Sequence, residues 1–283
     1  MRRKPARAAL EAVSRVLPPG PQAWARARAR RVWPPVGTVR FGSLRRLRPI
    51  GEAMGAHRGT PVDRHYIEGF LDRHAGRPGY VMGDVHGRVL EIGEDTYTRR
   101  FGVFHEGPEE SAPEAYVSSV DVLHGDGSNP NATIVGDLAT GDGIPAETYD
   151  CVICTQTLQV IYDIRAAIKN LHRTLKPGGV ALVTFSGILQ LCRPDYDLWG
   201  DYWRVTSLSA RRLFEEVFPP ENVTVEAHGN VLVATAILYG LAVEDLRQHE
   251  LDAHDPDYEV TIAVRATKSA AAAPAADRAR GEE

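Results

Sequence analysis

Short apolar runs alternate with stretches of helical spacing along most of this chain, and this alternation constrains the fold more than any other feature. Seven runs have the length and composition of buried strands: residues 88–92, 117–123, 132–135, 149–154, 180–185, 223–227 and 260–266. Apolar residues at helical spacing predict helices over residues 62–74, 164–175, 207–218 and 231–250. Strands that alternate with helices need crossover connections. The sequence therefore predicts an α/β fold with a seven-stranded, mostly parallel sheet and helices on both faces.

The two ends of the chain differ from this central region. Residues 1–50 carry thirteen Lys and Arg residues and one acid, Glu11, so this segment has a charge of about +12. The whole chain has a net charge of -4, which leaves about -16 on the remainder. We expect a basic, flexible arm over residues 1–50, a helical segment over 51–79, the main domain over 80–268 and a disordered tail over 269–283.

Composition excludes several classes of protein. The acidic main domain argues against a nucleic-acid-binding face. Three cysteines in a chain of 283 residues are too few for a disulfide scaffold, and Cys151 and Cys154 lie on opposite faces of a predicted strand. No Cys-rich or His-rich cluster predicts a metal site. The longest nearly apolar run, residues 231–243, is too short to span a bilayer. These features are typical of a cytoplasmic protein.

Polar residues follow the predicted strands at the edge of the sheet where ligands of parallel α/β folds bind. They are Glu91 and Gly93 on the first strand, Asp121 on the second, Asp137 and Leu138 after the third, and Thr155 and Gln156 at the end of the fourth. Two acids, Glu94 and Asp95, follow Gly93 directly. A dinucleotide pyrophosphate needs positive potential in that loop, so these carboxylates disfavour it. S-adenosylmethionine carries a sulfonium and an ammonium, and an acidic crevice suits it.

Four motifs in order carry a resemblance to a known family. They are VLEIGEDTYTRRFG at 89–102, Asp137-Leu138, YDCVICTQTLQVIYD at 149–163 and LKPGG at 175–179. In this order they resemble the motifs of class I S-adenosylmethionine-dependent methyltransferases of the methyltransferase type 11 kind, over about 190 residues. The resemblance implies a Rossmann-like class I methyltransferase fold and S-adenosylmethionine as the cofactor. It also implies that residues 51–79 cover the cofactor site.

The resemblance assigns roles to the residues at the strand ends. Glu91 and Gly93 would line the methionine part of the cofactor, and Asp121, with Asp126 as the alternative, would bind the ribose hydroxyls. Asp137 would receive the adenine amino group and Leu138 would pack on the ring, with Thr155 and Gln156 completing the pocket. The chain departs from the family at two glycines, which are replaced by Asp95 and Tyr97. Tyr97 is either a cover for the cofactor or a packing aromatic residue at a helix start.

Two further segments have the residue types of an acceptor site. A hydroxyl acceptor usually needs a general base, and residues 57–68 and 197–206 contain candidates among aromatic and charged side chains. The candidate bases are His57, His65 and Asp201. The candidate substrate-binding residues are Arg58, Tyr66, Trp199, Tyr202 and Arg204.

The region also resembles small bacterial methyltransferases that accompany glycosyltransferases and natural-product pathways. This resemblance implies O-methylation of a sugar, a glycan or a secondary-metabolite hydroxyl. An N- or C-methyltransferase of a natural-product pathway and a non-catalytic partner protein with the same fold are the alternatives. The basic arm, with Trp24 and Trp33, would allow peripheral contact with an anionic membrane. No nucleic-acid partner is expected, and the residues do not determine the oligomeric state.

Overall fold

The computed structural model describes residue 34 and residues 37–76, 83–104 and 115–270. The chain divides into two compact units, Met1–Arg48 and Pro49–Glu283. The described part of the first unit contains the short 3-10 helix η1, Gly42–Leu44. Most of the predicted arm and tail, including Trp24 and Trp33, lies outside the described residues. The second unit contains the sheet and the helices that cover it.

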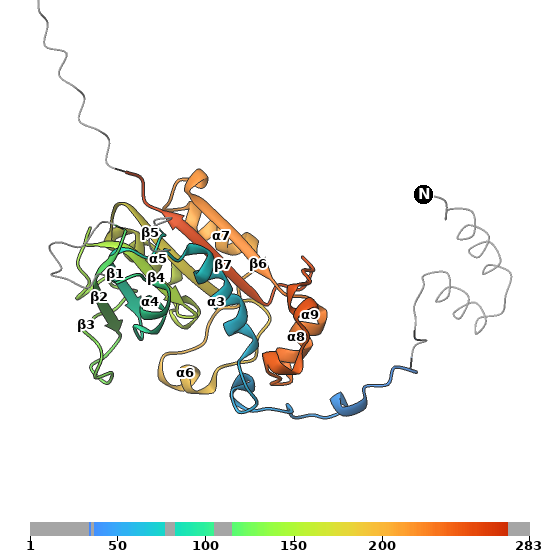
Figure 1. Ribbon diagram of the computed structural model, residues 1–283. Coiled ribbons are helices and arrows are strands. Elements are labelled where there is room, and N and C mark those ends of the chain that lie inside the picture. The colour runs from blue at the N-terminus through green and yellow to red at the C-terminus, as the bar shows by residue number, and fades with distance from the viewer. Residues whose placement is uncertain (1–33, 35–36, 77–82, 105–114, 271–283) are drawn as a thin grey trace, which may run out of the picture. The chain divides into compact units, whose positions relative to one another are not determined.

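The second unit is built on one seven-stranded sheet (Figure 1). Its strand order is β3-β2-β1-β4-β5-β7-β6, and β7 runs antiparallel to both of its neighbours while the other pairs are parallel. The strands are β1 Gly87–Ile92, β2 Val117–His124, β3 Ile134–Val135, β4 Tyr149–Thr155, β5 Leu175–Ser186, β6 Val223–His228 and β7 Thr261–Thr267. All seven predicted strands are confirmed, and so is the mostly parallel, Rossmann-like sheet.

Helices cover both faces of this sheet. On one face, Ile67, Phe70 and Leu71 of α3, with Tyr97 and Phe101 of α4, pack against β1, β4 and β5. On the other face, α5 and α7 build the larger core, which includes Phe185 of β5. The helices are α3 Val62–His74, α4 Thr96–Phe101, α5 Ile164–Thr174, α6 Arg193–Leu198, α7 Ser207–Glu215, α8 Val231–Leu238 and α9 Gln248–Asp252. Short 3-10 helices are η2 Ala53–Gly55, η4 Leu158–Val160, η5 Pro220–Asn222 and η6 Val243–Asp245.

The single helix predicted over residues 231–250 is wrong, because the chain turns after α8. Gly240 has a φ of +64°, and a Cβ atom built there would lie 2.1 Å from the carbonyl oxygen of Gly51. This close approach breaks the helical path, and η6 and α9 follow separately. The six-residue helix α6 escaped prediction, and α4 was expected only as a helix start at Tyr97, because both are too short to show a hydrophobic period.

The sheet register brings the carboxyl ends of the central strands to one level. Ile92 of β1 is paired with Leu123 of β2, and the Gly93 N–H donates to the Leu123 carbonyl oxygen at 2.9 Å. The strand order reverses between β1 and β4, which opens a crevice at this edge in folds of this class. In Figure 1, the β2 arrowhead points toward the end of the sheet where α6 lies, and β7 points the other way. Within the described ranges, no helix is long and apolar enough to cross a membrane.

Candidate functional site

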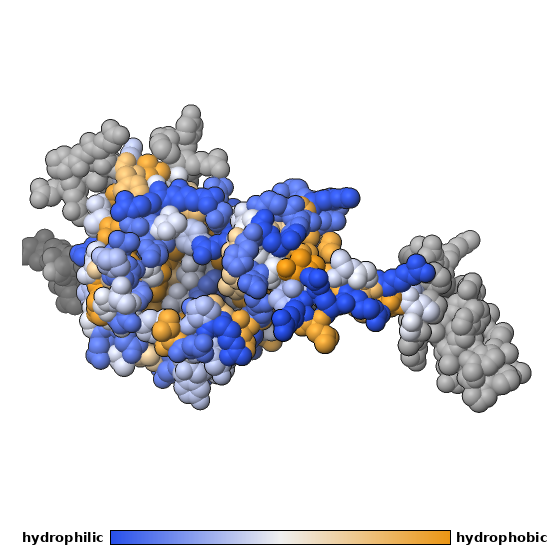
Figure 2. Space-filling view, turned by 90° about the horizontal axis from the view of Figure 1, so that it is seen from below, coloured by the Kyte–Doolittle hydropathy of each residue, from blue (hydrophilic) through white to orange (hydrophobic). Residues whose placement is uncertain are grey.

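A pocket of about 490 Å³ lies at the carboxyl ends of β1 to β4. This volume is within the range of small-molecule and cofactor sites. Figure 2 views this end of the sheet and shows a hollow with apolar and neutral residues, bordered by hydrophilic ones. The strand ends contribute Ile92, Gly93, Leu123, His124, Gly125, Gly136, Asp137, Leu138, Gln156 and Thr157. The remaining lining residues are Val160, Ile161, Tyr162, Asp195, Trp199 and Tyr202.

Gly93 begins the loop after β1 and borders the pocket directly. Its φ of +92° lies in the left-handed region that favours glycine. Apart from its two chain neighbours, no described residue has an atom within 4 Å of the place that a Cβ would take. The Asn129 side chain donates from Nδ2 to the Gly93 carbonyl oxygen at 2.6 Å. The loop is therefore held from the β2–β3 connection, and its backbone is open to close approach by a ligand.

Glu91 lies beneath this loop and not among the pocket-lining residues. Its side chain is buried, with 3% of the residue exposed. The carboxylate accepts hydrogen bonds from the Tyr97 N–H at 3.0 Å and from the Thr98 N–H and hydroxyl at 2.7 Å each. Burial raises the pKa of Glu91, although these hydrogen bonds oppose the shift. Both carboxylate oxygens are thus used to hold the start of α4.

Tyr97, the aromatic residue at a family glycine position, is also a packing residue in this structure. Its ring is buried beside Phe101, and its hydroxyl accepts a hydrogen bond from Arg64 of α3. The Arg64 guanidinium lies 5.5 Å from the Tyr97 ring centroid. Burial raises the pKa of Tyr97. Tyr97 therefore joins α4 to α3 and does not line the pocket.

The structure does not bring Asp121 to the pocket. Its carboxylate, in the middle of β2, accepts hydrogen bonds from Arg88 Nη2 at 2.8 Å, Thr133 Oγ1 at 2.9 Å and the Tyr149 hydroxyl at 3.0 Å. Burial would raise the pKa of Asp121, but these hydrogen bonds and the Arg88 charge hold it below its usual value. The alternative residue, Asp126, is also outside the lining.

His124 and Gly125 take the place beside Gly93 that an acid was expected to occupy. Sequence reasoning missed His124 because Asp121 matched the expected residue type. The signal that could have identified His124 is its position: it is the last residue of β2, level with Gly93, and Asp121 lies three residues earlier.

The ends of β3 and β4 agree better with the sequence-based placement. Asp137 and Leu138 line the pocket, and Asp137 Oδ1 accepts a hydrogen bond from the Ala139 N–H at 2.7 Å. Gln156, directly after β4, also lines the pocket. Thr155, the last residue of β4, is not among the lining residues. The carbonyl oxygen of Thr155 accepts a hydrogen bond from the Thr157 hydroxyl at 3.0 Å.

The segment after β5 crosses to the opposite side of the pocket through Trp199. The indole lies edge-on to the His124 ring, with centroids 5.8 Å apart, and its Cζ3 would be 3.1 Å from a Cβ built on Gly125. Tyr202 from the same segment also lines the pocket and packs edge-on against Tyr162, at 5.3 Å between centroids. We call residues 189–204 the roof segment.

Asp201 and Arg204 hold the roof segment together. The Asp201 side chain is 3% exposed and accepts hydrogen bonds from Arg204 Nη2 at 2.8 Å and the Cys192 N–H at 3.1 Å. Arg204 also donates to the carbonyl oxygens of Leu189 and Gln190, at 3.2 and 2.8 Å. The Arg204 hydrogen bond lowers the pKa of Asp201. Neither side chain lines the pocket, so Asp201 and Arg204 have a structural role: they hold residues 189–204 in place.

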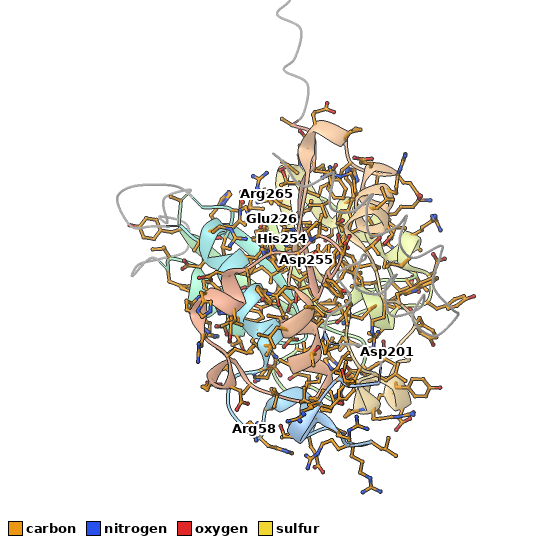
Figure 3. The ribbon with its side chains drawn as sticks, turned by 90° about the vertical axis from the view of Figure 1, so that its right-hand side faces the viewer. Arg58, Asp201, Glu226, His254, Asp255 and Arg265 are labelled. Atoms are coloured by element: carbon orange, nitrogen blue, oxygen red, sulfur yellow. The ribbon has the colours of Figure 1, made fainter. Side chains whose placement is uncertain are left out.

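The predicted acceptor segment at residues 57–68 lies away from the pocket. Arg58 forms an ion pair with Asp245 at 2.6 Å, and His57 is exposed. The Tyr66 hydroxyl donates to the Leu251 carbonyl oxygen at 2.9 Å, and His65 lies edge-on to Tyr66. Arg58 and Asp201 are well separated in Figure 3. None of the three candidate bases, His57, His65 and Asp201, is among the residues that line the pocket.

The described residues that line the pocket make it acidic. Among the described residues that line it, Asp137 and Asp195 are carboxylates, His124 is the histidine, and there is no Lys or Arg. Across the described part of the chain, no group of three or more His, Cys, Asp or Glu side chains could hold a metal ion.

Residues 116–183 match the family model described as a methyltransferase domain. This stretch includes β2, β3, β4 and most of β5, whose ends border the pocket. No curated protein matches the sequence.

Solved structures resemble the chain at low identity. Phosphoethanolamine N-methyltransferase 2 of Haemonchus contortus, in complex with S-adenosyl-L-methionine, is 15% identical, with a TM-score of 0.44 over 72% of this chain and 52% of that one. The chain thus spans about half the length of that enzyme. N-methyltransferase NodS of Bradyrhizobium japonicum WM9, in complex with S-adenosyl-L-homocysteine, is 13% identical, with a TM-score of 0.42 over 75% and 90%. A SAM-dependent methyltransferase from Archaeoglobus fulgidus is 13% identical, with a TM-score of 0.43 over 72% and 94%.

Proposed function

We propose that this chain, an enzyme with a methyltransferase domain and S-adenosylmethionine as its cofactor, methylates a hydroxyl group of a sugar, a glycan or a secondary metabolite. The cofactor supplies an electrophilic methyl group on a sulfonium. The protein must hold the acceptor oxygen in line with that methyl group, and alignment of this kind can supply much of the rate enhancement.

One observation carries the cofactor part of this proposal: the pocket lies at the strand reversal, and its described lining residues include two carboxylates and no Lys or Arg. A pyrophosphate would meet like charge there, whereas the sulfonium and ammonium of S-adenosylmethionine would meet opposite charge. The open backbone at Gly93 accommodates close approach of the ligand. The residues present therefore fit this cofactor.

Within the pocket, we assign the cofactor to the side formed by the ends of β1, β2 and β3. Asp137 would accept a hydrogen bond from the adenine amino group and Leu138 would pack on the ring. His124, which lies level with Gly93, would replace the expected acid as the partner of a ribose hydroxyl. Glu91 would act indirectly, because its carboxylate holds α4 and thereby the loop after Gly93.

The acceptor would then occupy the other side, between the end of β4 and the roof segment. A hydroxyl needs a base within hydrogen-bond reach as the methyl group is transferred. Asp195 lines the pocket from α6, whereas His57, His65 and Asp201 do not. We therefore assign the general base to Asp195 and the aromatic wall to Tyr202, which packs on Tyr162.

Calorimetric titration with S-adenosylhomocysteine, with NADH as the control ligand, tests the cofactor site. We expect micromolar binding of S-adenosylhomocysteine alone, and weakening by about tenfold in Asp137→Ala because one hydrogen bond is lost. Asp142→Ala is the matched control, since Asp142 is exposed in the same loop and does not line the pocket. Equal weakening in both variants would contradict the placement of the adenine.

Transfer of labelled methyl groups to hydroxyl and amine acceptors tests the reaction. Asp195→Asn should lower the transfer rate to a hydroxyl by about 10²- to 10⁴-fold, because general base catalysis is typically worth this much. The affinity for S-adenosylhomocysteine should stay within about twofold. Transfer to amines alone would favour the N-methyltransferase alternative.

A further inference from the structure

A small polar network lies at the junction of β4, η4 and β5, behind the pocket wall. The Gln156 side-chain oxygen Oε1 accepts hydrogen bonds from Gln159 Nε2 at 2.8 Å and from Ser186 Oγ at 2.6 Å. Gln159 is 7% exposed and Ser186 is 2% exposed. Gln156 is the member that lines the pocket.

This network has hydrogen-bonding capacity that the described residues do not use. Gln156 Nε2 and Gln159 Oε1 are buried and have no partner among these residues. The side-chain oxygen and nitrogen of an amide are assigned from their hydrogen bonds, so the opposite assignment of both side chains has to be considered. If both amides are turned by 180°, Gln156 donates to Gln159, and one donor and one acceptor are again left without a partner. Buried polar groups in folded proteins are normally satisfied by protein, water or ligand. The Gln156 amide therefore has unused hydrogen-bonding capacity at the wall of the pocket.

The backbone of Gln156 is also unusual. Its φ of +52° lies in the left-handed region, which residues other than glycine adopt rarely. The Gln156 N–H donates to the Thr184 carbonyl oxygen at 3.0 Å, which holds the residue at the end of β4. Uncommon backbone conformations of this kind cluster at functional sites.

The network is connected to the roof segment. The Gln159 carbonyl oxygen accepts hydrogen bonds from the Tyr202 N–H at 2.9 Å and the Trp203 N–H at 3.2 Å. Gln156 and the exposed aromatic side chain of Tyr202 therefore border the same pocket, on the acceptor side assigned above.

The residues around Gln156 favour an uncharged group on a ligand that binds there. A carboxylate or phosphate entering it would meet no lining Lys or Arg among the described residues, and two carboxylates share the pocket. An ammonium can only donate, and it could not satisfy an amide that presents its N–H. A hydroxyl both donates and accepts, so it satisfies the Gln156 amide in either orientation.

We propose that Gln156 is a specificity-determining residue that binds a hydroxyl of a neutral sugar ring, held against Tyr202. The inference rests on the proposed function and deepens it, because it names the acceptor class and moves Gln156 from the cofactor to the acceptor. Gln159 and Ser186 hold the Gln156 amide through its oxygen.

Saturation-transfer NMR on the full chain loaded with S-adenosylhomocysteine tests this. The probes are the methyl glycosides of glucose, galactose, mannose and rhamnose, with methyl glucuronide as the charged counterpart of the glucoside. We expect a signal from at least one neutral glycoside and at least a fivefold weaker signal from the glucuronide.

The variants Gln156→Asn and Gln156→Glu should each reduce the neutral signal at least fivefold. Asn tolerates the left-handed backbone but shortens the side chain, and Glu keeps the shape but brings a charge. Gln248→Asn, on the surface helix α9, is the matched control and should change nothing. All variants should bind S-adenosylhomocysteine within about twofold of wild type, which verifies folding of the site.

Three results would overturn the inference while leaving the cofactor assignment intact: no neutral glycoside signal, equal signals from the glucuronide and the glucoside, or unchanged signals in both Gln156 variants. Absence of S-adenosylhomocysteine binding to wild type would instead overturn the proposed function, and the inference with it.

Discussion

At the scale of single residues, several carboxylates expected to bind a ligand instead form contacts within the chain. Glu91 is the clearest example, because its two oxygens accept three hydrogen bonds from the first turn of α4. A carboxylate is the side chain that accepts without donating, and the partners of Glu91 include two backbone N–H groups. Residue type alone does not separate this role from direct contact with a cofactor.

Replacement of Glu91 by Gln should therefore destabilise the protein. An amide NH₂ would face an N–H donor, and the lost or repelled hydrogen bonds should lower the free energy of unfolding by about 1–3 kcal/mol. Urea denaturation followed by circular dichroism measures this. Glu94→Gln is the control, because Glu94 is exposed and its contacts with Asn129 and Asn131 are 3.5 Å long. Equal midpoints for both variants would contradict the anchoring role.

At the scale of elements, we expect the roof segment to depend on one ion pair, between Asp201, whose side chain is 3% exposed, and Arg204, whose side chain is 27% exposed. Asp201→Asn removes the charge that Arg204 binds, while the hydrogen bonds between β5 and β7 remain. We expect faster hydrogen exchange over residues 189–204 and unchanged exchange in the sheet. Methyl transfer should fall at least tenfold, with S-adenosylhomocysteine affinity changed much less. Asp197→Asn, an exposed change in the same segment, is the control. Unchanged exchange in Asp201→Asn would show that the ion pair does not order the roof.

The turn after α8 offers a second test at this scale. Gly240→Ala places a Cβ in the left-handed region and 2.1 Å from the Gly51 carbonyl oxygen. Strain at this φ alone costs about 1–2 kcal/mol, and the steric clash adds to it. Gly178→Ala is a matched control, because its φ is +84° and its Cβ would meet nothing within 4 Å. Thermal unfolding should show a larger loss of stability for Gly240→Ala than for Gly178→Ala. Equal losses would show that the close approach to Gly51 does not contribute to the destabilisation.

At the scale of the whole molecule, an ion-pair cluster joins three distant parts of the second unit. Asp84, ahead of β1, accepts hydrogen bonds from Arg265 of β7 at 2.7 Å and lies 2.7 Å from His74 Nδ1 of α3. Burial would raise the pKa of Asp84, but the hydrogen bonds and charges of these partners lower it to about 2. The folded state therefore binds the proton of Asp84 less readily than the unfolded chain.

This pKa gives a pH dependence of stability with a definite sign. Since the folded pKa is below the unfolded value, the stabilisation is present above about pH 4 and is lost as the pH falls toward 2. It amounts to about 2 kcal/mol. Urea denaturation at pH 6, 4.5 and 3 should show a smaller acid-induced loss for Asp84→Asn than for wild type. Asp142→Asn should retain the wild-type dependence, and a similar slope in all three proteins would contradict the assignment.

The sequence by itself determined the seven strands, the α/β class and the strand ends that form the pocket. These follow from local patterns, since apolar runs and helical periods depend on neighbours in the chain. Gly93, Asp137, Leu138 and Gln156 reach the pocket because they lie within three residues of the carboxyl ends of parallel strands.

Only the tertiary structure decided what the charged side chains do. The charged partner of Asp121 is Arg88, 33 residues away, and that of Arg58 is Asp245, 187 residues away. A carboxylate binds whichever donor the fold brings to it, and no local pattern records that donor. For the same reason His124 and Asp195 came to the pocket unpredicted: their positions depend on the register of β2 and on the path of the roof segment.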